Sequence, residues 1–142
     1  MKDVLHKSLR ALVPRGKPLA ASSVGTSDLV ARCEALQDTP LQDYSIEDLR
    51  LLVGQQIGLP WLVPLALAHL TQNLFSEGDY YAGDMLASIL RLENDYWRAH
   101  PAEGKTFKVA LAAQLSHADS HNLPRSVLKA AQQRLEYLEK LP

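Results

Sequence analysis

The stretch that decides the fold runs from Tyr44 to Leu92 and reads YSIEDLRLLVGQQIGLPWLVPLALAHLTQNLFSEGDYYAGDMLASILRL. Its first half holds two apolar runs with helical spacing, and the sequence Gly58-Leu59-Pro60 separates them. Glycine followed by proline at such a junction predicts a corner between two helices. We expect this cornered helix pair to lie at the centre of a single all-α domain of about six to eight helices.

Local signals place the start and the end of the first helix in this block. Ser45 and Asp48 have the spacing of a capping box, in which each side chain accepts a hydrogen bond from the other residue's backbone N–H. We expect Gly54 and Gly58 to end the helix, with Gly58 suited to a left-handed cap. The run that follows is apolar on more than one face, which predicts the central and most buried helix, with Pro60 in its first turn.

Helical spacing continues on both sides of the block. A helix that Thr26 or Ser27 would cap is predicted to carry one apolar face, formed by Leu29, Val30, Cys33 and Leu36. Cys33 is the single cysteine of the chain, so we expect a buried apolar side chain and no internal disulfide. Further helices are predicted over Lys105–Ser116 and from Pro124 to Leu141.

The composition is that of one globular, helix-rich domain. The chain has 142 residues, of which 46% are hydrophobic, 22% charged and only 6% aromatic, and the abundance of leucine and alanine favours helix over sheet. Residues 1–25 combine a short helical pattern with Pro, Gly and Ser, which predicts an N-terminal helix or arm and a linker. Residues 26–142 would then form the helical domain.

Charge is distributed unevenly along the chain. Residues 1–27 have a net charge of +4, residues 28–96 carry eleven acids against three arginines for a net charge of −8, and residues 97–142 have +3. Some of these acids occupy predicted helix N-termini, where the helix dipole favours them. The other interpretation is an anionic face that meets a cationic partner. The total charge of −1 does not favour nucleic acid or membrane as a partner.

The chain shows no sign of a membrane or secretion segment. The longest apolar run, Leu59–Ala68, is too short to span a bilayer. The N-terminal residues lack the continuous apolar core of a secretion signal. We therefore expect a cytoplasmic protein.

The stretch from Asn73 to Gly83 has the most unusual composition. It reads NLFSEGDYYAG and combines glycines, acids and two neighbouring tyrosines. One interpretation is a capped helix start, with Ser76 or Asp79 as the cap and one tyrosine in the core. The other is an exposed acidic and aromatic loop, a composition that anchors protein interfaces. The sequence leaves both interpretations open.

The candidates for catalytic or metal chemistry are weak. His117 and His121 are four residues apart but lie in a polar connection, and zinc needs three or four ligands. His69 has no partner in the sequence that would make it a catalytic base. The segment GQQIG lacks the lysine of a phosphate-binding loop. We therefore expect no enzyme activity, no metal and no cofactor; a small enzyme that uses these histidines is the alternative.

The central block resembles the immunity proteins of bacterial contact-dependent growth inhibition systems. The resemblance covers about residues 40–92 and depends on the order of several short motifs. These motifs are Asp48-Leu49-Arg50, Gly54-Gln55, Gly58-Leu59, Leu62, Pro64-Leu65-Ala66-Leu67, Glu77-Gly78-Asp79-Tyr80 and Gly83-Asp84-Met85-Leu86.

The resemblance implies a protein that binds and neutralises the toxic C-terminal domain of an adhesin delivered by a neighbouring cell. Such toxins are often nucleases, whose cationic active site an acidic face would cover. The residues expected to form this face are Glu77, Asp79, Tyr80, Tyr81 and Asp84, followed by Asp43, Glu47 and Asp48. The alternative is a helical adaptor that docks a partner through an apolar surface and has no toxin partner.

Overall fold

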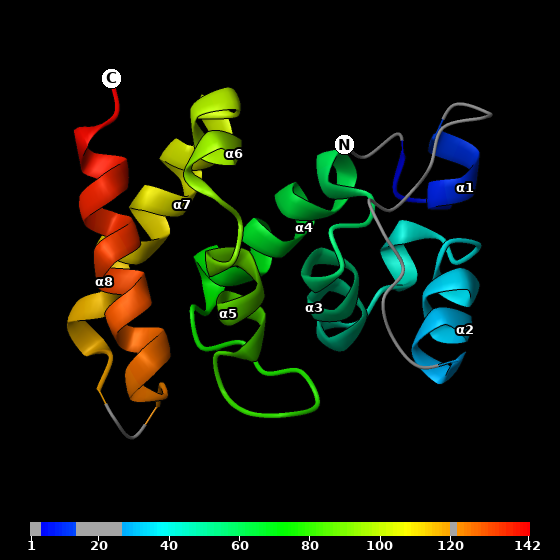
Figure 1. Cartoon of the computed structure of the whole chain (residues 1–142), viewed down its shortest axis with the longest axis horizontal. Helices are drawn as coiled ribbons and strands as arrows, with labels where there is room; N and C mark the ends of the chain where they lie inside the picture. The colour runs from blue at the N-terminus through cyan, green and yellow to red at the C-terminus, as the bar shows by residue number, and fades with distance from the viewer. Residues whose placement is uncertain (1–3, 14–26, 120–121) are drawn as a thin grey trace.

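The computed structural model describes residues 4–13, 27–119 and 122–142. Within these residues the chain forms eight α-helices and two short 3₁₀ turns and has no β-strand, so the predicted all-α fold is confirmed (Figure 1). The α-helices are α1 (Leu9–Leu12), α2 (Ser27–Leu36), α3 (Ile46–Gly54), α4 (Leu59–Gln72), α5 (Asp84–Leu90), α6 (Asn94–Ala99), α7 (Pro101–Gln114) and α8 (Arg125–Lys140). The 3₁₀ turns span Leu41–Asp43 and Leu115–His117.

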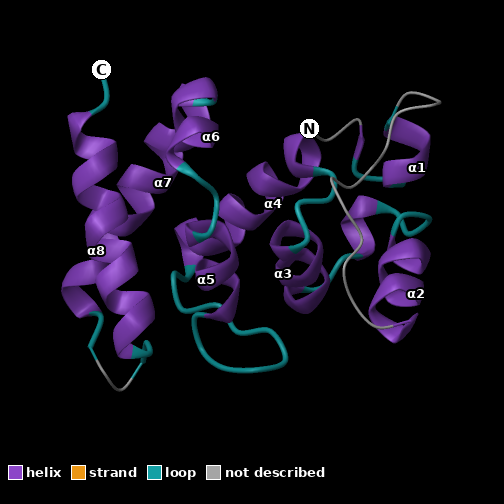
Figure 2. Ribbon diagram, viewed as in Figure 1, coloured by secondary structure: helices purple, strands orange, loops and turns teal. Residues whose placement is uncertain are grey.

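The helices follow one another across the molecule in roughly their chain order. Figure 2 shows α1 and α2 at one end, α3, α4 and α5 in the middle, and α6, α7 and α8 at the other end. Helix α3 packs against α4 and α5, while α4 also packs against α7, which in turn contacts α8. Helix α4 therefore connects the two halves of the domain.

The predicted capping box begins α3 and is confirmed. The backbone N–H of Asp48 donates to Ser45 Oγ at 3.1 Å, and the backbone N–H of Ser45 donates to Asp48 Oδ2 at 3.0 Å. Two N–H groups that no helical carbonyl can reach are satisfied in this way. The helix start is consequently fixed by residues that lie only three positions apart.

The corner between α3 and α4 differs from the prediction. Helix α3 ends at Gly54, and Gln56 takes the left-handed conformation with φ 58°. The N–H groups of Gln56 and Ile57 bond back to carbonyls of the last turn, as in a Schellman motif. Gly58 is also left-handed, with φ 64°, but it precedes α4 instead of ending α3. The prediction that Gly54 ends α3 is therefore confirmed, while the prediction that Gly58 is its left-handed cap is wrong.

The apolar side of α4 forms the middle of the core, as predicted. Its buried residues are Leu62, Val63, Ala66, Leu67 and Leu70. Pro60 lies in the first turn, where the missing N–H costs no helical hydrogen bond. The predicted central helix is thus found where the apolar run placed it. The prediction that it is the most buried helix is wrong, because five of its 14 residues are buried against five of the seven in α5.

Gln114 at the end of α7 closes the end of α4. Its Nε2 donates to the carbonyl of Leu70 at 2.8 Å and to that of Thr71 at 3.1 Å. Its Oε1 accepts from the N–H of Leu74 at 2.6 Å. One amide thereby satisfies backbone groups that the end of a helix leaves unpaired. Nothing in the sequence indicated this contact, because it joins residues about forty positions apart.

The C-terminal half contains the two predicted helices with shifted boundaries. The helix expected over Lys105–Ser116 already begins at Pro101 and ends at Gln114. Proline occupies the first turn of the helix, where it is tolerated. Trp97 and Phe107 are both fully buried, with ring centroids 5.0 Å apart. The predicted C-terminal helix is confirmed as α8, whose bounds differ from the prediction by one residue at each end.

The N-terminal residues that are described belong to the core. Leu9 is fully buried, and Cys33 is buried as predicted. Val30, which was expected on the same apolar face as Cys33, is exposed instead. Residues 14–26, which contain the predicted linker and the predicted cap Thr26, lie outside the described residues, as does the side chain of Ser27. The division of the chain at residue 25 stays a prediction.

Gly58 and Gly54 provide a matched test of the corner. A Cβ at Gly58 would lie 2.8 Å from both methyl carbons of Leu9 and would force a left-handed φ on alanine, whereas a Cβ at Gly54 would meet nothing closer than 3.7 Å. We expect Gly58→Ala to lower the free energy of unfolding by about 2 kcal/mol or more. We expect Gly54→Ala to leave it unchanged or raise it by up to about 1 kcal/mol. Urea denaturation checks both variants, and equal effects would contradict the proposed corner geometry.

Candidate partner-binding surface

A loop from Asn73 to Gly83 joins α4 to α5 and projects from the lower edge of the molecule in Figure 1. The residue that precedes α5 is Gly83, which is left-handed with φ 89° and offers no side-chain cap. Ser76 instead donates its hydroxyl to the carbonyl of Asn73 at 2.6 Å. The prediction that Ser76 or Asp79 caps this helix is therefore wrong.

Asp84, the first residue of α5, holds the loop from the inside. Its side chain is 3% exposed. Oδ1 accepts from the N–H of Gly78 at 2.6 Å, and Oδ2 accepts from the N–H of Tyr80 at 3.1 Å. Since an ionised acceptor strengthens these bonds, the carboxylate fixes the backbone of the loop over α5.

Glu47 holds the same loop from α3. It is 6% exposed, and its Oε1 accepts from the N–H of Asp79 at 2.9 Å. Arg50, one turn later, donates to both carboxylate oxygens of Glu47, with Nε at 2.6 Å and Nη2 at 2.5 Å. The hydrogen bond from Arg50 is the largest cause that lowers the pKa of Glu47. Glu47 is therefore held as a carboxylate beneath the loop.

Gly78 allows the two acids to approach the loop this closely. A Cβ at this position would lie 2.5 Å from Oε1 of Glu47 and 3.0 Å from Oδ2 of Asp84. Any side chain would therefore push the loop away from the two carboxylates. The glycine is needed here for space.

Arg32 of α2 completes a network of charges. Its Nη2 lies 3.5 Å from Oδ1 of Asp48, and its Nη1 lies 4.0 Å from Oε2 of Glu47. Nε of Arg50 lies 3.9 Å from Oδ2 of Asp84. The network joins α2, α3, α5 and the loop. The role of the two arginines was not predicted from the sequence. The three-residue spacing of Glu47 and Arg50 on one helix is a signal from which their pairing could have been predicted.

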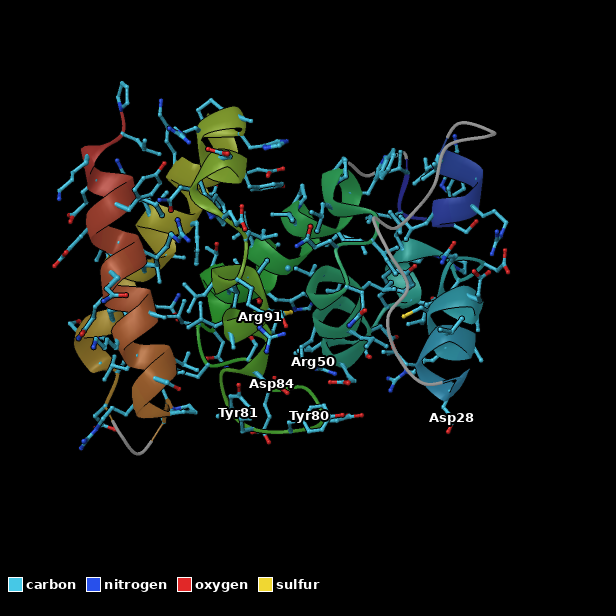
Figure 3. All side chains as sticks on the ribbon, viewed as in Figure 1. Asp28, Arg50, Tyr80, Tyr81, Asp84 and Arg91 are labelled. Carbon is cyan, nitrogen blue, oxygen red and sulfur yellow. The ribbon has the colours of Figure 1, made fainter. Side chains whose placement is uncertain are left out.

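The outer side of the loop presents tyrosines and acids. Tyr80 is 71% exposed and Tyr81 is 40% exposed, and the carboxylates of Glu77 and Asp79 are exposed beside them. Figure 3 shows both tyrosines at the lower edge, with Arg50 and Asp84 on the scaffold above them. The guanidinium of Arg50 lies 4.7 Å from the centroid of the Tyr80 ring, a cation–π contact.

The structure thus divides the eight residues expected to form the acidic face. Five are exposed and available to a partner, and three are held in internal contacts. The exposed residues are Glu77, Asp79, Tyr80, Tyr81 and Asp43; those in internal contacts are Glu47, Asp84 and Asp48. We call the loop residues Glu77, Asp79, Tyr80 and Tyr81 the acidic tyrosine turn.

The histidines considered as catalytic or metal-binding residues lie elsewhere. His69 and His117 are exposed, and His121 lies outside the described residues. In the described part of the chain, no group of three or more His, Cys, Asp and Glu side chains is arranged to hold a metal ion. In the same residues no helix has both the length and the apolar character needed to cross a membrane.

The comparisons with known proteins bear on the same part of the chain. The family model for CDI immunity proteins matches residues 16–107. This range contains α2 to α6 and the whole loop. No curated protein and no solved structure matches the chain.

Glu47→Gln tests the ion pair beneath the loop. We expect it to lower the free energy of unfolding at neutral pH by about 2 kcal/mol, since an amide cannot replace the charged bonds to Arg50. Because the pKa of Glu47 is lowered in the folded protein, its contribution is complete above the ordinary glutamate pKa of 4.5 and is lost as pH falls through the folded value. The difference between the wild type and the variant should therefore shrink below pH 4.5.

Urea denaturation from neutral pH to about pH 3 measures this difference. Glu77→Gln is the matched control, because Glu77 is exposed; it should follow the wild type at every pH. If the free energies of unfolding of the wild type and Glu47→Gln differed by the same amount at every pH, the ion pair would not titrate as described.

Proposed function

Because the chain belongs to the family of CDI immunity proteins, we propose that it binds and neutralises the C-terminal toxin domain of a contact-dependent growth inhibition adhesin through the acidic tyrosine turn. We further propose that this toxin domain is a nuclease. In this proposal the turn covers the cationic active site of the toxin and excludes its nucleic-acid substrate. The chain itself carries out no reaction.

The observation that carries this proposal is the pair of free carboxylates in the turn. Among the described residues, no lysine or arginine pairs with Glu77 or Asp79, whereas Glu47, Asp48 and Asp84 all have arginines within 4.0 Å. Charge that the scaffold does not neutralise remains available to a partner. A nuclease must present cations to hold phosphates, so such a surface attracts it and competes with its substrate.

The tyrosines supply apolar contact area next to this charge. Tyrosine gives a large, rigid contact area at a small cost in side-chain entropy. Tyr80 already rests on Arg50, and its backbone N–H is held by Asp84, so less of its freedom remains to be lost on binding. These properties favour Tyr80 as an anchor in the centre of the interface.

In the proposed interface, the three acids with internal contacts support the structure and do not contact the toxin. Glu47 and Asp84 hold the backbone of the turn and act as positioning residues, while Asp48 caps α3. Asp43 is exposed at the end of the Leu41–Asp43 turn and extends the face toward the start of α3. We therefore expect the direct contacts to come from the turn and from Asp43.

The double variant Glu77→Lys/Asp79→Lys tests the charged contact. We expect it to weaken binding to the cognate toxin domain by about 30-fold or more, which corresponds to about 2 kcal/mol. Tyr80→Ala should weaken binding by a similar factor. Titration calorimetry measures the affinity, and survival of cells that produce the toxin measures the protection.

Glu136→Lys/Glu139→Lys on α8 is the matched control, because it makes the same change in charge at two exposed positions away from the turn. It should bind and protect like the wild type. Binding by the wild type should weaken as salt rises, and a short nucleic acid should compete for the toxin. Full affinity and protection with both turn variants, together with binding that salt does not change, would support the apolar adaptor instead.

A further inference from the structure

A cavity of about 320 Å³ lies between α6, α7 and the end of α8. Its apolar lining includes Trp97, Leu138, Leu141 and the backbone of Gly104. Trp97 and Leu138 are buried parts of the core, so these walls are fixed by packing. The volume falls at the small end of the range of about 300–1,000 Å³ that is usual for ligand sites.

The charged side chains that line the cavity are all cationic. They are Arg98 from α6 and Lys105 and Lys108 from α7. Of the described residues that line the cavity, none has a carboxylate side chain. Arg98 pairs with Asp95, but within the described chain neither lysine pairs with an acid. The lysines lie one turn apart on α7, so both reach the same side of the cavity.

Gly104 keeps part of this cavity open. It lies inside α7 and has no positive φ, and a Cβ there would make only ordinary contacts, 3.6 Å from Leu138 and 3.9 Å from Trp97. Neither the backbone nor a close approach therefore requires glycine. Glycine in a helix costs about 1 kcal/mol relative to alanine. Both neighbours of the missing side chain line the cavity, so its absence adds to the open volume.

We propose that this cavity binds a small organic anion with an apolar body, such as an aromatic carboxylate. The apolar part rests against Pro101 and Leu141, which line the cavity and are at least partly exposed. The carboxylate meets Lys105 and Lys108. The cavity also lies at the N-terminal end of α7, where the helix dipole favours negative charge. An apolar wall with a few polar groups on one side is the usual form of a small-molecule site.

This site is separate from the acidic tyrosine turn. Figure 1 shows α6 and the C-terminal end of α8 at the upper edge, opposite the loop that joins α4 to α5. The two surfaces also carry opposite charge. The proposed anion site therefore does not depend on the toxin-binding proposal.

Titration of the full chain with naphthalene-2-carboxylate tests the proposal by calorimetry and by ligand-observed NMR. We expect one saturable site. The neutral analogue 2-naphthalenemethanol should bind about tenfold more weakly, because it lacks the charge that meets the lysines. The absence of saturation up to the solubility limit of the carboxylate, or equal affinity for both compounds, would overturn the proposal.

Substitutions of residues that line the cavity test whether the binding occurs there. Lys105→Glu/Lys108→Glu should weaken binding of naphthalene-2-carboxylate by about tenfold or more. Arg125→Glu/Lys129→Glu makes the same change in charge at exposed positions of α8 outside the cavity and should bind like the wild type. Gly104→Leu should abolish binding by filling the cavity, while thermal unfolding confirms that the variant is folded. If Gly104→Leu does not fold, the two double variants decide, and equal binding by both would overturn the proposal.

Discussion

The buried carboxylates of Glu47 and Asp84 are the constraint on which the acidic tyrosine turn depends. Burial of a charge is unfavourable unless the charge is paired and hydrogen-bonded. Both conditions are met here, since Arg50 pairs with Glu47 and the backbone of the loop donates to both acids. Without these contacts the loop would have lost its main attachment to α3 and α5, and its tyrosines would have no fixed position.

This arrangement separates charge that stabilises the fold from charge that remains available to a partner. In the acidic block, the inner acids are neutralised by Arg32 and Arg50, and the outer acids Glu77 and Asp79 point to solvent. A net charge computed from sequence counts both kinds equally. The recognition surface that we propose is therefore a short turn, which is small enough to act as the centre of an interface.

The parts of the fold that the sequence predicted are those set by neighbouring residues. The Ser45–Asp48 capping box, the buried position of Cys33 and the apolar run of α4 all depend on local spacing, and all are confirmed. The role of Gly58 was mistaken because the Schellman motif closes earlier, at Gln56. The sequence also did not show which acids point inward, since Glu47 accepts from the backbone N–H of Asp79, 32 positions away.

The hydrogen bonds of the turn come from its backbone N–H groups at Gly78, Asp79 and Tyr80. The exposed side chains of the turn contribute none of these bonds. Mutation can therefore change the outward chemistry of the turn while its main chain keeps the same path. Under the proposed function, such a scaffold can adapt to a new toxin by exchanging a few surface residues, and its folding need not be optimised again each time.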